Sequence, residues 1–170
     1  MNSFLTRFVE FLLFTMLFLS SCKNPHIIEI PSLLDMDNVT ILKEQVIEDC
    51  KLCKEGITIY KIELDSKTIE NFSVKENKYF PNHVDSTWYG YGWFSTPVDP
   101  YHTKVFHHLN YISKNKVEKV LLEIKNTIKE NGVYYAFYIR HFVEDLDPLE
   151  AQIIVLNPNT KMLYIVISMT

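Results

Sequence analysis

One segment of the chain shows helical spacing of apolar residues more clearly than any other. Between residues 115 and 131, apolar side chains recur at every third or fourth position, and the charged residues, Glu123 among them, fall on the other side. The apolar stripe consists of Val117, Val120, Leu121, Ile124 and Ile128. Asn115 and Glu118 have the spacing of a capping box, and Gly132 stands where a C-terminal cap belongs. The pattern predicts an amphipathic helix packed on a core.

A similar spacing follows Asn38 and predicts an earlier helix. Its apolar face would comprise Val39, Leu42, Val46, Cys50 and Cys53. Asp37 or Asn38 could cap its start, and Gly56 would end it. The β-branched and aromatic run 57–64 then predicts a strand, and 66–72 a short helical turn.

Three further extended runs follow the predicted helix at 115–131. They are Val133–Phe142, Ala151–Asn157 and Leu163–Met169, and turn-forming residues at 157–161 separate the last two. A helix followed by an antiparallel meander indicates an α+β domain. We therefore expect an antiparallel sheet with one or two helices packed on one face, and the C-terminal helix leading into a three-stranded meander.

The segment from Tyr79 to Tyr111 contains ten aromatic residues. Its centre reads Trp88-Tyr89-Gly90-Tyr91-Gly92-Trp93. In a strand, Tyr89, Tyr91 and Trp93 would share one face and the two glycines would leave the other face bare. Two interpretations follow: the rings belong to the core of an aromatic-rich domain, or Trp88, Tyr89, Tyr91 and Trp93 form a surface for a ligand or partner.

The N-terminus contains one basic residue, Arg7, before a strongly apolar run from Phe11 to Leu19. This run is shorter than the roughly 20 residues of a membrane-spanning helix and fits the apolar region of a signal peptide. Leu19-Ser20-Ser21-Cys22 follows it. This tetrapeptide resembles the lipobox of bacterial lipoproteins, which has an aliphatic residue, two small residues and then a cysteine.

The resemblance implies that residues 1–21 are removed and that Cys22 becomes the lipid-modified N-terminus. It implies palmitate-type acyl chains on Cys22 and no other cofactor. Lys23 stands where an aspartate favours the inner membrane, which implies the outer membrane, facing the periplasm. Residues 22–36 would form the lipidated N-terminus and tether, with the second half docked on the body, and 37–170 a single domain.

Composition supports a folded domain. The chain is 47% hydrophobic and has a formal net charge of −4, so no basic surplus indicates nucleic acid. With Cys22 lipidated, Cys50 and Cys53 remain as a pair. The pair has three interpretations: a structural disulfide, two reduced apolar side chains, or a redox site, although its predicted place at a helix end is not thioredoxin-like.

Candidate metal and catalytic chemistry is sparse. The domain contains five histidines, His83, His102, His107, His108 and His141, with Asp85 and Asp99 near them in the sequence. Their spacing matches no recognised metal-ligand framework. We expect no metal site. No nucleophile elbow, phosphate loop or paired-carboxylate motif occurs, so no catalytic residue is assigned.

These observations favour a non-enzymatic, membrane-anchored envelope lipoprotein whose α+β domain binds another envelope macromolecule, a protein or a glycan. One alternative is an immunity-type or inhibitor lipoprotein that neutralises a periplasmic toxin, which small size and acidity fit. Another is a His-dependent hydrolase, which requires His102, His107 or His108 to meet a carboxylate in a cleft.

Overall fold

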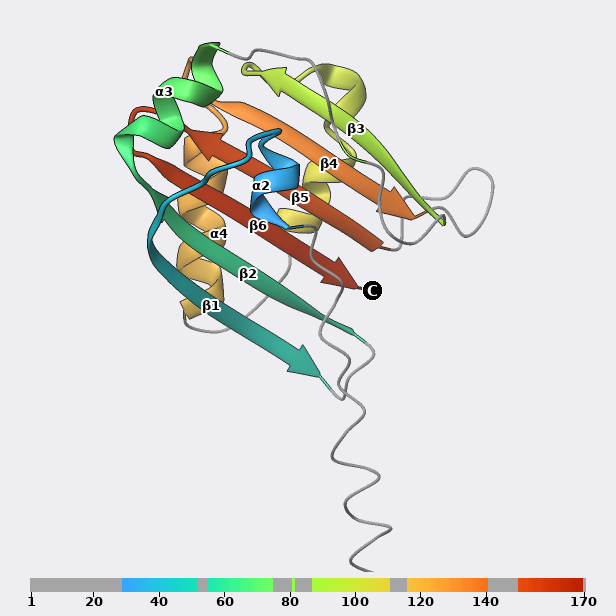
Figure 1. Ribbon diagram of the computed structural model, residues 1–170. Helices are drawn as coiled ribbons and strands as arrows, with labels where there is room; N and C mark the ends of the chain where they lie inside the picture. The colour runs from blue at the N-terminus through green and yellow to red at the C-terminus, as the bar shows by residue number, and fades with distance from the viewer. Residues whose placement is uncertain are drawn as a thin grey trace, which may run out of the picture.

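The computed structural model describes residues 29–51, 55–74, 81, 87–110, 116–140 and 150–169, and its centre is one antiparallel sheet (Figure 1). The six strands pair in the order β1-β2-β6-β5-β4-β3, so β1 and β3 are the two edges. The strands are β1 (Ile41–Lys51), β2 (Glu55–Leu64), β3 (Trp88–Ser95), β4 (Tyr134–Arg140), β5 (Glu150–Asn157) and β6 (Met162–Met169).

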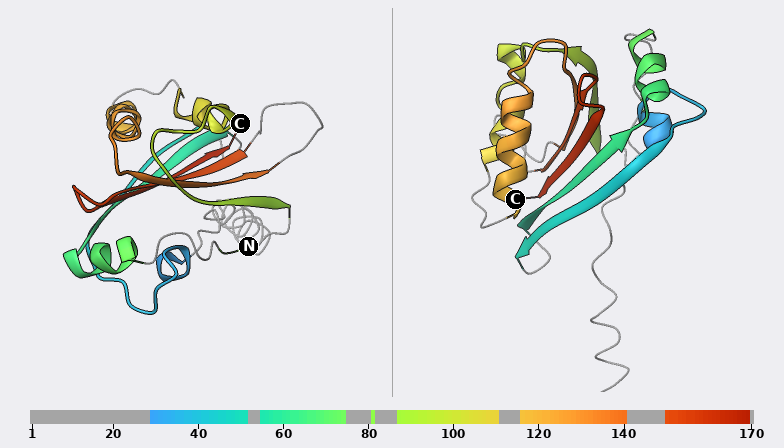
Figure 2. Two further views of the ribbon diagram at one scale, coloured as in Figure 1. Left: turned by 90° about the horizontal axis from the view of Figure 1, so that it is seen from above. Right: turned by 90° about the vertical axis from the view of Figure 1, so that its left-hand side faces the viewer.

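Helical segments cover both faces of this sheet (Figure 2). Helix α4 (Lys116–Thr127) and the 3-10 turns η1 (Pro100–His102) and η2 (Val105–Asn110) lie on one side, which we call the α4 face. The helices α2 (Ile30–Leu33) and α3 (Ser66–Val74) lie on the other side, the α3 face. Because both faces are covered, residues 151–157 and 163–168 are buried without interruption.

The α+β class, the antiparallel sheet and the helix leading into a three-stranded meander are confirmed, with α4 followed by β4, β5 and β6. We expected helices on one face of the sheet, whereas helices cover both faces. Alternate residues of the meander supply a second apolar layer, which Leu33, Leu34 and Met36 cover together with α3. The second half of the segment assigned to the tether thus contributes to the core.

The helix expected after Asn38 is wrong, because this segment is the edge strand β1. Its partner is β2, with Glu44 opposite Ile62 and Ile47 opposite Ile59. Among the β1 residues whose burial is described, Ile47 alone is buried, at 6% exposed. An edge strand buries few side chains, so its sequence lacks a strong alternation of apolar and polar residues. The apolar residues of this segment recur at intervals of three and four by chance, and this spacing did not indicate a helix.

The next two elements agree with the predictions from the sequence. The predicted strand 57–64 is β2, and the predicted helical turn 66–72 is α3. The turn after β5 is built by Asn157, whose Oδ1 accepts the backbone N–H of Asn159 at 3.0 Å. Within the described ranges, no helix is long and apolar enough to cross a membrane.

Candidate binding surface at the β3 edge

An irregularity in β3 decides which aromatic side chains share a face. Tyr91 lies opposite Phe137 and Phe94 lies opposite Tyr135, so two residues of β3 face one residue of β4 between these pairs. Such a bulge interrupts the alternation of side chains. Tyr91 and Phe94 therefore lie on the same face, with the Tyr91 ring stacked on Phe137 at 4.8 Å between centroids and the Phe94 ring stacked on Tyr135 at 5.4 Å.

The two tryptophans lie on the opposite, α3 face and are half-buried. Trp93 packs edge-on against Phe72 with ring centroids 5.1 Å apart, and its Nε1 donates a hydrogen bond to the Leu33 carbonyl at 3.1 Å. Trp88 packs against the same apolar layer. The expected row of Tyr89, Tyr91 and Trp93 on one face is thus wrong, because the bulge turns Trp93 into the layer that binds residues 33–36.

Three tyrosines remain exposed at this edge of the molecule. Tyr89 is 56% exposed, Tyr91 is 39% exposed and Tyr101, in η1, is 92% exposed. Tyr89 pairs opposite Ile139 and so faces the α4 side, like Tyr91. We call these three residues the tyrosine surface. Tyr101 belongs to the aromatic segment identified in the sequence, but the exposure of its side chain depends on how η1 packs against the sheet.

The turn η1 is held over the buried aromatic rings by one hydroxyl group. The Tyr135 hydroxyl accepts the Asp99 backbone N–H at 3.0 Å and lies 3.1 Å from His102 Nδ1. Burial raises the pKa of Tyr135, so its hydroxyl stays protonated. Asp99 Oδ1 in turn accepts the Tyr101 backbone N–H at 2.8 Å. This arrangement places Tyr101 next to a fixed imidazole.

The His102 ring links this turn to β3. Its centroid lies 4.5 Å from that of Phe94 and 5.1 Å from that of Phe137, the same ring on which Tyr91 stacks. Tyr91 of β3 and His102, the residue after Tyr101 in η1, therefore contact the same buried ring. Because the Tyr91 ring is already stacked, it loses little conformational entropy when it binds a partner.

The histidines contact different partners. His102 contacts the buried aromatic rings, His107 is exposed, and His108 Nδ1 lies 3.1 Å from Ser168 Oγ. Ser168 is only 1% exposed, so this Ser–His pair has no access to a substrate. Among the described residues, no group of His, Cys, Asp or Glu side chains has the arrangement of a metal site.

Several predicted sites lie outside the described residues. They are the lipid-attachment residue Cys22, Cys53, His83, Asp85 and His141. Cys50 belongs to β1, but its side chain is not described, so the Cys50–Cys53 disulfide stays a prediction.

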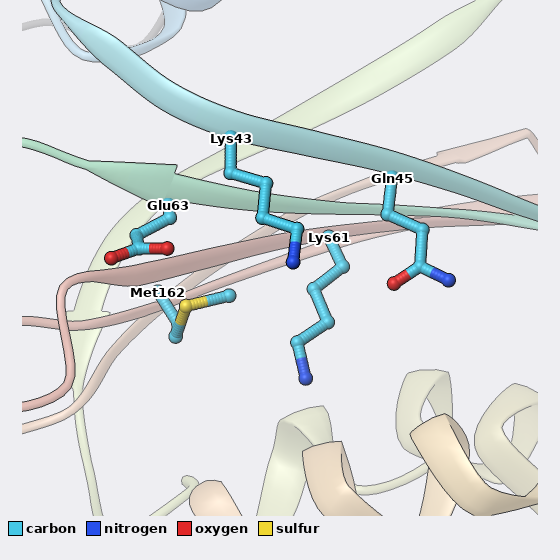
Figure 3. Close-up of a pocket in the computed structure, with 5 residues that line it drawn as sticks. All are labelled: Lys43, Gln45, Lys61, Glu63 and Met162. Atoms are coloured by element: carbon cyan, nitrogen blue, oxygen red, sulfur yellow. The ribbon is translucent and has the colours of Figure 1, made fainter.

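A second polar feature lies on the α4 face near β1. A shallow hollow of about 180 Å³ is lined by Lys43, Gln45, Lys61, Glu63 and Met162 (Figure 3). Lys43 and Lys61 project from neighbouring strands on the same side. Lys43 lies opposite Glu63 in the strand register. Lys61 pairs with Glu123, and the residues that line the hollow carry charges of both signs, so we interpret the hollow as a surface of mixed charge.

Glu123 ties α4 to the sheet, although the sequence pattern placed it among the residues facing away. Lys61 Nζ donates to both Glu123 carboxylate oxygens at 2.7 and 2.8 Å, and the Tyr164 hydroxyl donates to Oε1 at 2.7 Å. Burial acts to raise the pKa of Glu123, but the hydrogen bonds from Lys61 and Tyr164 outweigh it, so this pKa is lowered. Burial and the Glu123 carboxylate raise the pKa of Tyr164.

No family model matches the chain, and neither a curated protein nor a solved structure matches it.

Proposed function

We propose that this protein is a lipid-anchored envelope lipoprotein whose domain binds another envelope macromolecule through the tyrosine surface. The observation that supports it most is the exposure of Tyr89, Tyr91 and Tyr101 at one edge of the molecule, with the Tyr91 ring stacked on the buried Phe137. Tyrosine brings a large apolar area and a hydroxyl group at low entropic cost, and it is enriched at the energetic centres of protein interfaces. A protein partner is therefore favoured over a glycan.

The anchor is supported by the signal-like run before Cys22 and by the lipobox resemblance. Two or more acyl chains hold a protein durably at a membrane, whereas one chain binds only marginally. A Cys22→Ser variant should accumulate as uncleaved precursor without incorporating labelled palmitate. A variant that is processed and membrane-bound like the wild type would overturn the anchoring.

The surface is tested by placing a photo-crosslinking amino acid at Tyr91 or Tyr101 in the full-length protein in cells. The matched control is Leu122 on α4, which is also exposed, at 57%. We expect one discrete protein adduct from both tyrosine positions and none from the control. Adducts of the same pattern at all three positions, or none at any, would refute the surface.

A glycan partner is distinguished by isothermal titration calorimetry with purified peptidoglycan fragments. If the partner is a protein, the fragments should give no heat of binding. Replacing Tyr91 and Tyr101 by alanine should weaken binding to the cross-linked partner. For residues at an interface centre the loss is about 2 kcal/mol or more each, which is at least about 30-fold in Kd.

The His-dependent hydrolase finds no support in the described geometry, since His102 and His108 contact different partners and Ser168 is buried.

A further inference from the structure

The strand β1 presents a long outer edge on the side of the sheet opposite to β3 (Figure 1). It has 11 residues, about twice the length of a typical strand. In the part of the chain that the structure describes, no strand pairs with its outer side. Residues 41–46 and 48 are all exposed. An exposed edge of this length is a template on which another extended chain can pair.

One face of β1 combines apolar and acidic side chains at strand spacing. Glu44, Val46 and Glu48 lie opposite Ile62, Tyr60 and Thr58 of β2 respectively. Val46 is 48% exposed, and Leu42, nearer the start of the strand, is 59% exposed. The pKa of Tyr60 is raised by burial and then by the charges of Glu48 and Glu44, which places both carboxylates close to this ring. The edge is therefore apolar at its centre and negative on both sides.

We propose that the β1 edge binds an extended segment of a basic polypeptide, which adds to the sheet as an antiparallel strand. Cationic side chains of that segment lie opposite Glu44 and Glu48, and an apolar side chain lies opposite Val46. Opposite charges directly across a strand pair are stabilising, whereas like charges are destabilising. This partner is independent of the tyrosine surface, since β1 and β3 are opposite edges of the sheet.

A second copy of this chain fits the face of Glu44, Val46 and Glu48 less well than a basic strand does. In an antiparallel pair of β1 strands centred on Val46, each Glu44 would lie opposite Glu48 of the other copy, so like charges would meet on this face. Each Lys43 would lie opposite Asp49 in the same register, so only the charges on the other face would be complementary. A strand with cationic residues two positions on either side of an apolar one complements Glu44, Val46 and Glu48 directly.

The test uses the full-length protein in detergent micelles and two fluorescein-labelled seven-residue peptides of high β-propensity. The first peptide has lysines at the positions opposite Glu44 and Glu48 and valine between them; the second has glutamates in place of the lysines. Fluorescence anisotropy should show the lysine peptide binding at least tenfold more tightly. In the double variant Glu44→Lys, Glu48→Lys the preference should reverse.

A matched control changes the same net charge elsewhere, in the double variant Glu70→Lys, Glu118→Lys, whose two positions are exposed on α3 and α4. This control should retain the wild-type preference. Amide hydrogen exchange should show new protection in β1 with the lysine peptide. Absence of binding, equal binding of both peptides, or an equal effect of the control variant would overturn the proposal.

Discussion

Replacing Tyr135 by phenylalanine removes one hydroxyl group and keeps the buried ring. The ring is 1% exposed, and its hydroxyl connects to the Asp99 N–H and to His102 Nδ1 at 3.0 and 3.1 Å. Since the hydroxyl accepts from Asp99, its own proton is available to His102. Both groups belong to the segment that carries Tyr101, so the substitution tests whether β4 holds the η1 turn in place.

The magnitude follows from two lost hydrogen bonds. Each contributes about 0.5–1.5 kcal/mol to folding, so Tyr135→Phe should lower the free energy of unfolding by about 2 kcal/mol. For a domain of this size, that corresponds to a decrease in Tm of roughly 4–8 °C. Urea denaturation measures the loss, and hydrogen exchange at the amides of Tyr101 and His102 should accelerate at least about tenfold as η1 opens locally.

The matched control is Tyr138→Phe on the same strand. Its hydroxyl is also buried and donates to the Pro81 carbonyl at 2.7 Å, on the α3 face. Loss of this hydrogen bond should destabilise the variant by about 1 kcal/mol, but exchange in η1 should stay unchanged. A loss below about 0.5 kcal/mol for Tyr135→Phe with unaltered η1 exchange would show that the hydroxyl does not position the tyrosine surface.

Three further variants test the packing of α4 and its turn. Folding lowers the pKa of the Glu123 carboxyl group. The stability that the Glu123 carboxylate contributes is therefore fully present above the pKa of the unfolded state, and it is lost as the pH falls through the lower pKa of the folded state. Glu123→Gln should therefore cost about 1 kcal/mol at pH 7 in urea denaturation, and a deficit that persists unchanged at pH 2 would contradict this. The Thr96 hydroxyl donates a hydrogen bond to one backbone carbonyl and accepts one from a backbone N–H within residues 130–133. Thr96→Val should therefore lower the free energy of unfolding by about 2 kcal/mol, whereas unchanged stability would exclude these bonds. Gly132 has φ of 76°, so Gly132→Ala should cost about 1 kcal/mol despite open space around it, and a stabilised variant would refute the argument.

Elements with strong local patterns could be predicted from the sequence. The stripe of α4 has helical spacing over three turns, and the runs in β5 and β6 are too apolar and β-branched for loops. The turn at Asn157 also has a local cause, since its side chain caps the following backbone. These features depend on residues only a few positions apart in the sequence, and the spacing of apolar residues reflects interactions over this range.

Elements defined by distant partners could not be predicted. β1 exists because β2 supplies its hydrogen-bonding partners, and its own exposed side chains show no clear alternation. The bulge in β3 depends on pairing with β4, and it separates Trp93 from Tyr91 although the sequence alternates without a break. Glu123 has the position of a solvent-facing helix residue until Lys61 and Tyr164 meet it across the sheet.

Adjacent residues therefore predict an export signal before Cys22, and they also predicted the local elements of the α+β domain apart from β1. Tertiary structure alone decided which aromatic rings are exposed and which edges of the sheet are open. The exposure of a side chain depends on what packs against it, and Leu33, whose carbonyl accepts the hydrogen bond from Trp93 Nε1, lies 60 positions away in the sequence. The same long-range packing leaves Tyr89, Tyr91 and Tyr101 at the surface.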